Sequence, residues 1–92
     1  MAYFLYILQS EHSGVFYTGS SDNPQRRVHF HNTIETGFTS RYRPWKIVFT
    51  KEYPTKHLAQ QAERKVKSWK SRKMIEQLIT GAIEIYPERV GM

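Results

Sequence analysis

The chain contains no cysteine, so it has neither disulfide bonds nor thiolate ligands for a metal. Any metal ion must therefore be held by oxygen or imidazole. The chain also lacks a run of about 20 apolar residues, which a membrane-spanning helix requires. Its Tyr-rich start has no basic segment followed by an apolar core, as a secretory signal would. We therefore expect a cytoplasmic protein without a membrane partner.

Acidic residues are scarce, with 8 Asp and Glu against 14 Lys and Arg, and the formal net charge is +6. An excess of this kind attracts polyanions through the long-range field and through counterion release. The basic residues gather around aromatic ones, as on many nucleic-acid-binding surfaces. A solvated helix face explains the second group equally well when that group is taken alone. The candidate nucleic-acid contacts are Arg26, then Arg41, Arg43 and Lys46 around Tyr42 and Trp45, and then Lys67, Lys70, Arg72 and Lys73 around Trp69.

The length of 92 residues allows one domain with a modest core. Internal repeats and low-complexity segments are absent from the sequence. We place the folded body at residues 1–80 and a C-terminal tail at residues 81–92.

The first half of the chain predicts a hairpin followed by a helix. Residues 3–8 and 15–18 are rich in β-branched and aromatic side chains, and a polar turn containing Gly14 separates them. Asn23 then offers a helix cap and Pro24 suits the first helical position, so a helix is expected over residues 24–32.

The second half predicts a loop over residues 33–44, a strand over residues 45–53 and two helices. Thr55 caps the first helix and Ser71 the second, which Gly81 ends. The order β-β-α-β-α-α indicates an α+β fold, with a small antiparallel or mixed sheet covered by helices. The inward-facing helix positions are Leu58, Ala59, Ala62, Val66 and Trp69, then Ile75, Leu78 and Ile79.

Four polar side chains of the hairpin and the first helix have the chemistry of a phosphate-ester site. Arg27 and His31 are four residues apart and share a helix face, and Tyr6 and Tyr17 lie one on each hairpin strand. Arg binds phosphate while keeping its charge, and His transfers protons near neutral pH. An exposed helix face and tyrosines that fill the core are the commoner origins of such patterns.

Glu63 is the single carboxylate in a strongly basic stretch, residues 62–73. Lys67, four residues later, is well placed to form an ion pair with it. A carboxylate there can also provide one oxygen ligand to Mg²⁺, which takes its remaining ligands from water and phosphate. The two roles are compatible.

These residues, in this order, resemble the GIY-YIG nuclease superfamily. The resemblance is closest to its small single-domain members, which look like the N-terminal nuclease module of the bacterial excision-repair C subunit. Each motif is weak alone, whereas their order and spacing together are specific. The motifs are Phe4-Leu5-Tyr6, Tyr17-Thr18-Gly19, Arg26-Arg27-Val28 with His31-Asn32, the segment from Thr39 to Lys46, Ala62-Glu63 with Val66-Lys67, and Leu78-Ile79.

The resemblance implies a small three-stranded antiparallel sheet flanked by helices and an endonuclease that hydrolyses phosphodiester bonds in DNA. Glu63 would hold a single Mg²⁺ or Mn²⁺, and Arg27 would stabilise the phosphorane. Tyr6 and Tyr17 would orient or deprotonate the attacking water. His31 would assist, either as a proton carrier or by positioning Tyr17.

The chain departs from the family pattern at several positions. Ser20 stands where the repair members usually carry Lys, and residues 80–92 contain no Asn, which many members have after the last core helix. From the length of 92 residues we expect no added DNA-binding domain. We therefore expect low sequence specificity, recognition of a distorted structure, or specificity from a protein partner, in DNA repair or processing. The sequence does not distinguish a monomer from a homodimer.

Two other functions stay open from the residues. The first is a non-catalytic nucleic-acid-binding module with the same fold. The second is a protein-interaction domain that uses Trp45 and Trp69 as anchors.

Overall fold

The computed structural model describes residues 2–85 and contains one antiparallel sheet of three strands. The strands are β1 (Tyr3–Ser10), β2 (Phe16–Ser21) and β3 (Trp45–Tyr53), in the order β2-β1-β3. The predicted hairpin is confirmed, because β1 pairs with β2 along its length, and the third strand pairs with β1 on the other side.

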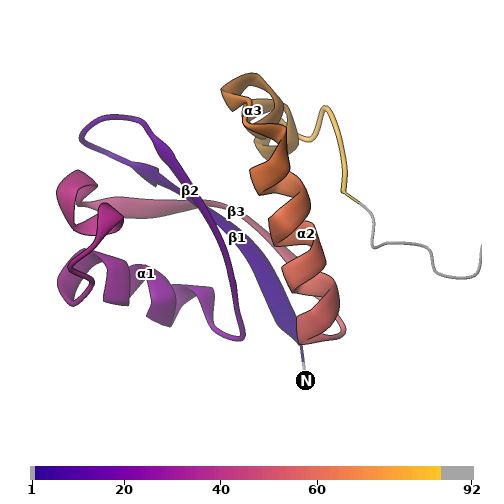
Figure 1. Ribbon diagram of the computed structural model, residues 1–92, viewed down its shortest axis with the longest axis horizontal. Coiled ribbons are helices and arrows are strands. Elements are labelled where there is room, and N and C mark those ends of the chain that lie inside the picture. Colours follow the sequence, from indigo (N-terminus) through magenta and orange to yellow (C-terminus); the bar gives the residue numbers. More distant parts are fainter. Residues whose placement is uncertain (1, 86–92) are drawn as a thin grey trace, which may run out of the picture.

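Helices cover both faces of the sheet (Figure 1). Helix α1 (Pro24–Thr33) and the short 3₁₀ helix η1 (Phe38–Tyr42) lie on one face. Helices α2 (Lys56–Trp69) and α3 (Arg72–Thr80) lie on the other. The α+β class and the order of the predicted strands and α-helices are confirmed, and η1 is an additional element.

Strand β1 is central, and it is buried on both faces. Its four middle residues have almost no exposed surface. Alternation along the strand directs Leu5 and Ile7 into the core beneath α2 and α3, and Tyr6 and Leu8 into a second core beneath α1. Tyr6 is thus held in the core on the α1 face of the sheet.

The α-helices begin at the capping residues that the sequence predicts. Asn23, Thr55 and Ser71 each accept a hydrogen bond from a backbone N–H in the first turn of α1, α2 and α3. A cap of this kind contributes about 1 kcal/mol to stability. Gly81, at φ 87°, ends α3 in the left-handed conformation that suits glycine.

The segment between α1 and β3 is more ordered than the predicted loop. The buried Thr39 of η1 accepts a hydrogen bond at its carbonyl from the Trp45 indole N–H, at 2.7 Å. Asn32 at the end of α1 also accepts a bond from the Trp45 backbone N–H and donates one to the Trp45 carbonyl. These bonds join residues that are 6 and 13 positions apart. Local composition therefore did not predict the 3₁₀ helix η1.

The described part of the C-terminal segment packs on the α2 and α3 face. Ile85 is 2% exposed and belongs to the core there. The rest of the predicted tail, residues 86–92, lies outside the described residues. Within residues 2–85, every helix is too short or too polar to span a membrane.

Candidate active site

Tyr6 and Gly19 face each other across β1 and β2, where their Cα atoms are direct partners in the ladder. The phenol ring of Tyr6 occupies the space that a side chain at position 19 would take. A Cβ built on Gly19 would lie 2.5 Å from the Tyr6 hydroxyl oxygen. Glycine is therefore required here by the close approach of the ring.

The Tyr6 hydroxyl is buried and lies beside the imidazole of α1. Its oxygen is 3.2 Å from His31 Nε2, and the residue is 1% exposed. Burial raises the pKa of Tyr6 to about 12, and the nearby Arg27 guanidinium partly opposes this rise. Tyr6 is consequently a protonated phenol at neutral pH, and its hydroxyl is in hydrogen-bond contact with His31.

His31 connects Tyr6 with η1. Its Nδ1 atom is 3.1 Å from the hydroxyl oxygen of Thr39, and the residue is 1% exposed. Burial lowers the pKa of His31, and the Arg27 guanidinium lowers it further. A neutral imidazole with both nitrogens in contact with hydroxyl groups is therefore the form present at neutral pH.

Tyr17 also packs against His31. The centroids of the two rings are 4.8 Å apart, and the ring of Trp45 lies 6.2 Å from that of Tyr17. The sequence left open whether His31 carries a proton or positions Tyr17. His31 has the polar contact with Tyr6 and only a ring contact with Tyr17.

Arg27 extends from α1 toward the two buried groups. Its guanidinium carbon lies 4.5 Å from the ring centroid of Phe30, one turn later on the helix. The same guanidinium is close enough to influence the pKa values of both Tyr6 and His31. A fixed positive charge is thus placed beside the phenol and the imidazole, as expected from the shared helix face.

Glu63 reaches this group of residues along the β2 edge of the sheet. It lies on α2, and its Oε1 accepts a hydrogen bond of 2.6 Å from Ser20 Oγ on β2. Its Oε2 pairs with Lys67 Nζ at 2.7 Å, which confirms the predicted ion pair. The carboxylate is close enough to Tyr6 to add to the rise in the Tyr6 pKa.

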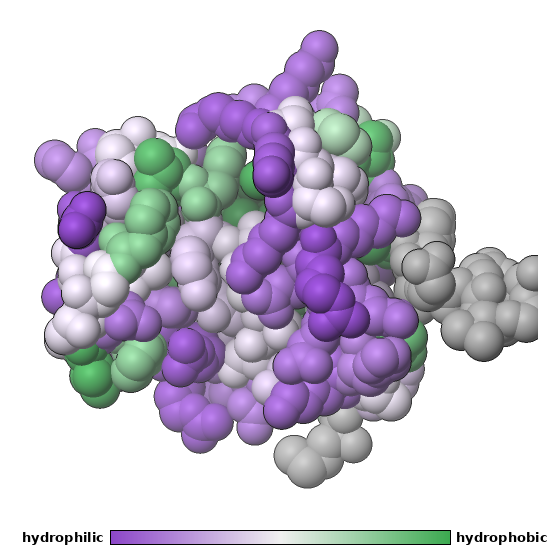
Figure 2. Space-filling model, in the orientation of Figure 1, coloured by the Kyte–Doolittle hydropathy of each residue, from purple (hydrophilic) through white to green (hydrophobic). Residues whose placement is uncertain are grey.

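The site is therefore assembled around edge strand β2. Tyr17 and Gly19 face the α1 side of that strand, and Ser20 contacts α2 on the other. In Figure 2, hydrophilic side chains crowd over α2, and a paler strip separates them from α1. The arrangement combines a fixed cation, two phenols, a neutral imidazole and a partly exposed carboxylate.

A family model for the GIY-YIG catalytic domain matches residues 2–76 of the chain. The chain belongs to the GIY-YIG family. It is 33% identical over 64 residues to a UPF0213 protein of Limosilactobacillus reuteri (strain DSM 20016), a match that spans 66% of each chain. The solution NMR structure of a UPF0213 protein from Bacillus halodurans is similar, with a TM-score of 0.55 and 30% identity. That match covers 87% of this chain and 84% of the other.

Glu63 is the one carboxylate among the five candidate catalytic residues, so it is the residue that could ligate Mg²⁺ or Mn²⁺. No cluster of three or more His, Cys, Asp or Glu side chains occurs among residues 2–85. Mg²⁺ nevertheless often binds through one or two carboxylates and keeps several waters and phosphate oxygens as ligands. Glu63 fits that pattern because its side chain is 21% exposed and each oxygen accepts one hydrogen bond, which leaves lone pairs free.

Seven of the eight predicted nucleic-acid contacts are exposed, and the eighth, Arg43, is half-buried and serves the fold. Arg43 donates to the carbonyl of His31 at 2.7 Å and to that of Glu35, at the end of α1. Arg72 donates to the carbonyl of Gly14 at 3.0 Å and pairs with Glu76. Arg72 is nevertheless exposed. Two of the other six exposed residues have acidic partners, since Arg26 pairs with Asp22 and Lys67 pairs with Glu63. The other four are Arg41, Lys46, Lys70 and Lys73.

Of the two tryptophans predicted as anchors for a protein partner, one is buried and the other is only partly exposed. Trp45 is 3% exposed and lies in the core beneath α1, which contradicts its prediction as an anchor. Trp69 is half-buried against the other core. Both indoles serve packing because each lies where a helix meets the sheet.

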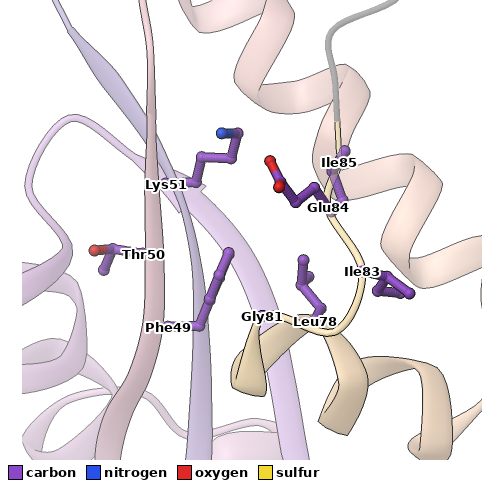
Figure 3. Close-up of a pocket in the computed structure, with 8 residues that line it drawn as sticks. All are labelled: Phe49, Thr50, Lys51, Leu78, Gly81, Ile83, Glu84 and Ile85. Atoms are coloured by element: carbon purple, nitrogen blue, oxygen red, sulfur yellow. The ribbon is translucent and has the colours of Figure 1, made fainter.

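The structure also contains a hollow of about 210 Å³ on the α3 side of the sheet (Figure 3). Its walls are mostly apolar, and it includes Leu78, Ile83 and Ile85. In Figure 3 the side chains of Lys51 and Glu84 extend toward each other at its rim. None of the five candidate catalytic residues lines it, so we do not assign it to the active site.

Sequence reasoning did not assign roles to Ser20 and Thr39. Ser20 holds Glu63, and Thr39 contacts His31, so both orient candidate catalytic groups. Ser20 could have been found from alternation along β2, which turns it toward α2 when Gly19 faces Tyr6. Thr39 carries no such local signal.

Proposed function

We propose that this GIY-YIG domain is a divalent-metal-dependent endonuclease that hydrolyses phosphodiester bonds in DNA with low intrinsic sequence specificity. The observation that carries the proposal is the convergence of five side chains along β2: Tyr6, Tyr17, Arg27, His31 and Glu63. They come from β1, β2, α1 and α2, and each has a function in phosphoryl transfer.

Glu63 is the proposed ligand of one Mg²⁺ or Mn²⁺, which would polarise the phosphate when bound. Ser20 and Lys67 hold the carboxylate in place. Lys67 is also near the ring of Tyr17, with 5.9 Å between Nζ and the ring centroid. This position brings a second positive charge to the proposed phosphate site.

Tyr6 and His31 form the proposed path for the proton of the attacking water. In the tautomer that carries its proton on Nδ1, His31 donates to Thr39 and accepts the Tyr6 hydroxyl proton at Nε2. Tyr6 can then take a proton from water as the water oxygen bonds to phosphorus. The bond from phosphorus to the leaving oxygen breaks, and a solvent water protonates that oxygen. Because the pKa of Tyr6 is about 12, it would not ionise alone at neutral pH, and the neutral His31 supplies the base.

Arg27 stabilises the additional negative charge as phosphorus becomes pentacovalent, because its guanidinium stays charged and binds phosphate oxygens in pairs. The contact with Phe30 restricts the side chain to one region above the helix. Tyr17 completes the site by orienting the water.

The compact size of the domain supports low sequence specificity. Base-specific reading usually requires a helix or strand inserted in a groove, and we assign none of the helices or strands of residues 2–85 to that role. We therefore propose a role in repair or processing of DNA, with a distorted structure or a protein partner supplying the target.

The test is nicking of supercoiled plasmid with Mg²⁺ or Mn²⁺, with EDTA as the metal-free control. We expect Glu63→Gln to lower the rate by at least about 100-fold, because the metal loses its protein ligand. Glu76→Gln is the matched control, since Glu76 also forms an i,i+4 ion pair, with Arg72, but lies on α3. Glu76→Gln should cleave like the wild-type protein.

Undiminished cleavage by Glu63→Gln would refute the assignment. Binding of DNA without cleavage under all metal conditions would instead favour the non-catalytic nucleic-acid-binding module.

A further inference from the structure

Phe38 is one of two large hydrophobic residues that are mostly exposed in the described part of the chain. It is 52% exposed, and the other, Ile34, is 62% exposed. Unlike Ile34, Phe38 has a ring held by other aromatic rings. Its centroid lies 4.9 Å from that of Tyr42 and 6.3 Å from that of Trp45. A half-exposed ring that contacts other aromatic rings provides a flat surface at little cost in conformational entropy.

This surface is connected directly to the candidate active site. The rings of Phe38 and Tyr17 are stacked, with an angle of 27° between their planes and 6.5 Å between their centroids. The next residue, Thr39, is buried and contacts His31 Nδ1. A planar group on the exposed side of Phe38 would therefore have a fixed position relative to Tyr17 and His31.

An exposed cation lies on the same side of η1. Arg41 follows Phe38 by three residues, and side chains three apart on a 3₁₀ helix are eclipsed, about 6 Å apart along the axis. Aromatic rings that stack with bases, next to basic residues that contact the backbone, are the usual combination in proteins that bind single strands.

We propose that Phe38 stacks with an unpaired nucleobase next to the phosphate at the active site and that Arg41 contacts the adjoining backbone. This inference rests on the proposed function, because it assigns the substrate of the same site. The bases inside a duplex are covered by their neighbours, so only an unpaired base offers a free face. The favoured substrate is consequently single-stranded, frayed or branched nucleic acid.

Binding without metal tests this inference separately from cleavage. Fluorescence anisotropy in EDTA would compare a labelled 12-nucleotide oligo(dT) with a blunt duplex and with an abasic strand of equal charge. An oligo(U) of the same length would show whether the sugar matters. The variants are Phe38→Leu, which keeps an apolar side chain without a ring, Phe38→Trp, and Ile34→Ala as the control.

Phe38→Leu should weaken oligo(dT) binding by about 5- to 100-fold, the range for loss of one base–aromatic stack. Phe38→Trp should restore the affinity, and Ile34→Ala should leave it unchanged. Duplex and abasic binding should change less than twofold in Phe38→Leu. Circular dichroism would verify that each variant is folded.

Equal oligo(dT) affinity for the wild-type protein and Phe38→Leu would overturn the inference. So would an equal loss of affinity for the duplex, or no binding of oligo(dT) by the wild-type protein. If the oligo(dT) affinities of the Phe38 variants change as expected but no metal supports cleavage, the proposed nuclease function is refuted. The inference that Phe38 binds a base is then still supported.

Discussion

The substitution Gly19→Ala tests the close contact on which the candidate site depends. The added Cβ would lie 2.5 Å from the Tyr6 hydroxyl oxygen and 2.6 Å from the ring carbon that carries it. Restoring an ordinary contact of 3.4 Å requires a shift of about 0.9 Å. Tyr6 is 1% exposed on the central strand, so its ring has no open space into which it can turn.

Two effects of this shift can be measured. Overpacking a core costs about 1–3 kcal/mol, and replacing a strand glycine by alanine returns about 0.5–1 kcal/mol. The middle of both ranges gives a net loss of about 1 kcal/mol, which lowers the melting temperature of a domain this size by about 4–8 °C. The shift also disrupts the 3.2 Å contact between Tyr6 and His31, and a 1 Å displacement of a catalytic group can cost about 100-fold in rate.

The assays are thermal unfolding followed by circular dichroism and the plasmid-nicking rate. Gly37→Ala is the matched control, because Gly37 has φ −88° and the nearest atom to its built Cβ is 3.5 Å away. It should change neither quantity appreciably. In a Tyr6→Leu background the clashing atoms are gone, so Gly19→Ala should no longer destabilise the protein.

The reasoning is refuted if Gly19→Ala melts and cleaves like Gly37→Ala. It is also refuted if Gly19→Ala lowers the melting temperature equally with Tyr6 and with Leu at position 6. The second result would place the strain elsewhere in the sheet.

Two further predictions concern charge in the buried parts of the site. Burial lowers the pKa of His31 below its ordinary 6.5, so the unfolded chain binds the proton more tightly, and stability should fall as the pH drops below about 6.5. Thermal unfolding between pH 7.5 and 5 should show this loss in the wild-type protein and a smaller one in His31→Gln; equal slopes would contradict the assignment. Arg43→Ala should destabilise the fold by about 1.5–3 kcal/mol in urea unfolding, since Arg43 donates to two carbonyls at the end of α1. Arg41→Ala should stay within about 0.5 kcal/mol of wild type, because Arg41 is exposed, while weakening DNA binding; similar stabilities of the two variants would be evidence against this division.

These two arginines show where sequence reasoning about the site was insufficient. Arg41 and Arg43 stand in the same basic segment, and both were predicted to contact nucleic acid. Only the packing of η1 against the end of α1 turns Arg43 toward backbone carbonyls and leaves Arg41 exposed. The two arginines are only two residues apart, yet one is exposed and the other is hydrogen-bonded to backbone carbonyls. The composition of the segment is the same for both, so it does not predict this difference.

The local features of the fold were predictable because they depend on nearest neighbours. The caps at Asn23, Thr55 and Ser71, the turn at Gly14 and the alternation along β1 involve residues a few positions apart. Turn, cap and periodicity rules describe such short-range energies well. The order of the family motifs likewise required only the sequence.

The sequence by itself determined which groups could take part in the chemistry, that is, two phenols, a guanidinium, an imidazole and one carboxylate in family order. Only the tertiary structure decided how they meet. The antiparallel register places Tyr6 over Gly19, and the packing of α2 brings Glu63 to Ser20, 43 residues away in the sequence. Contacts at such separations arise from the packing of the two helical layers on the sheet, and short-range sequence rules do not contain that information.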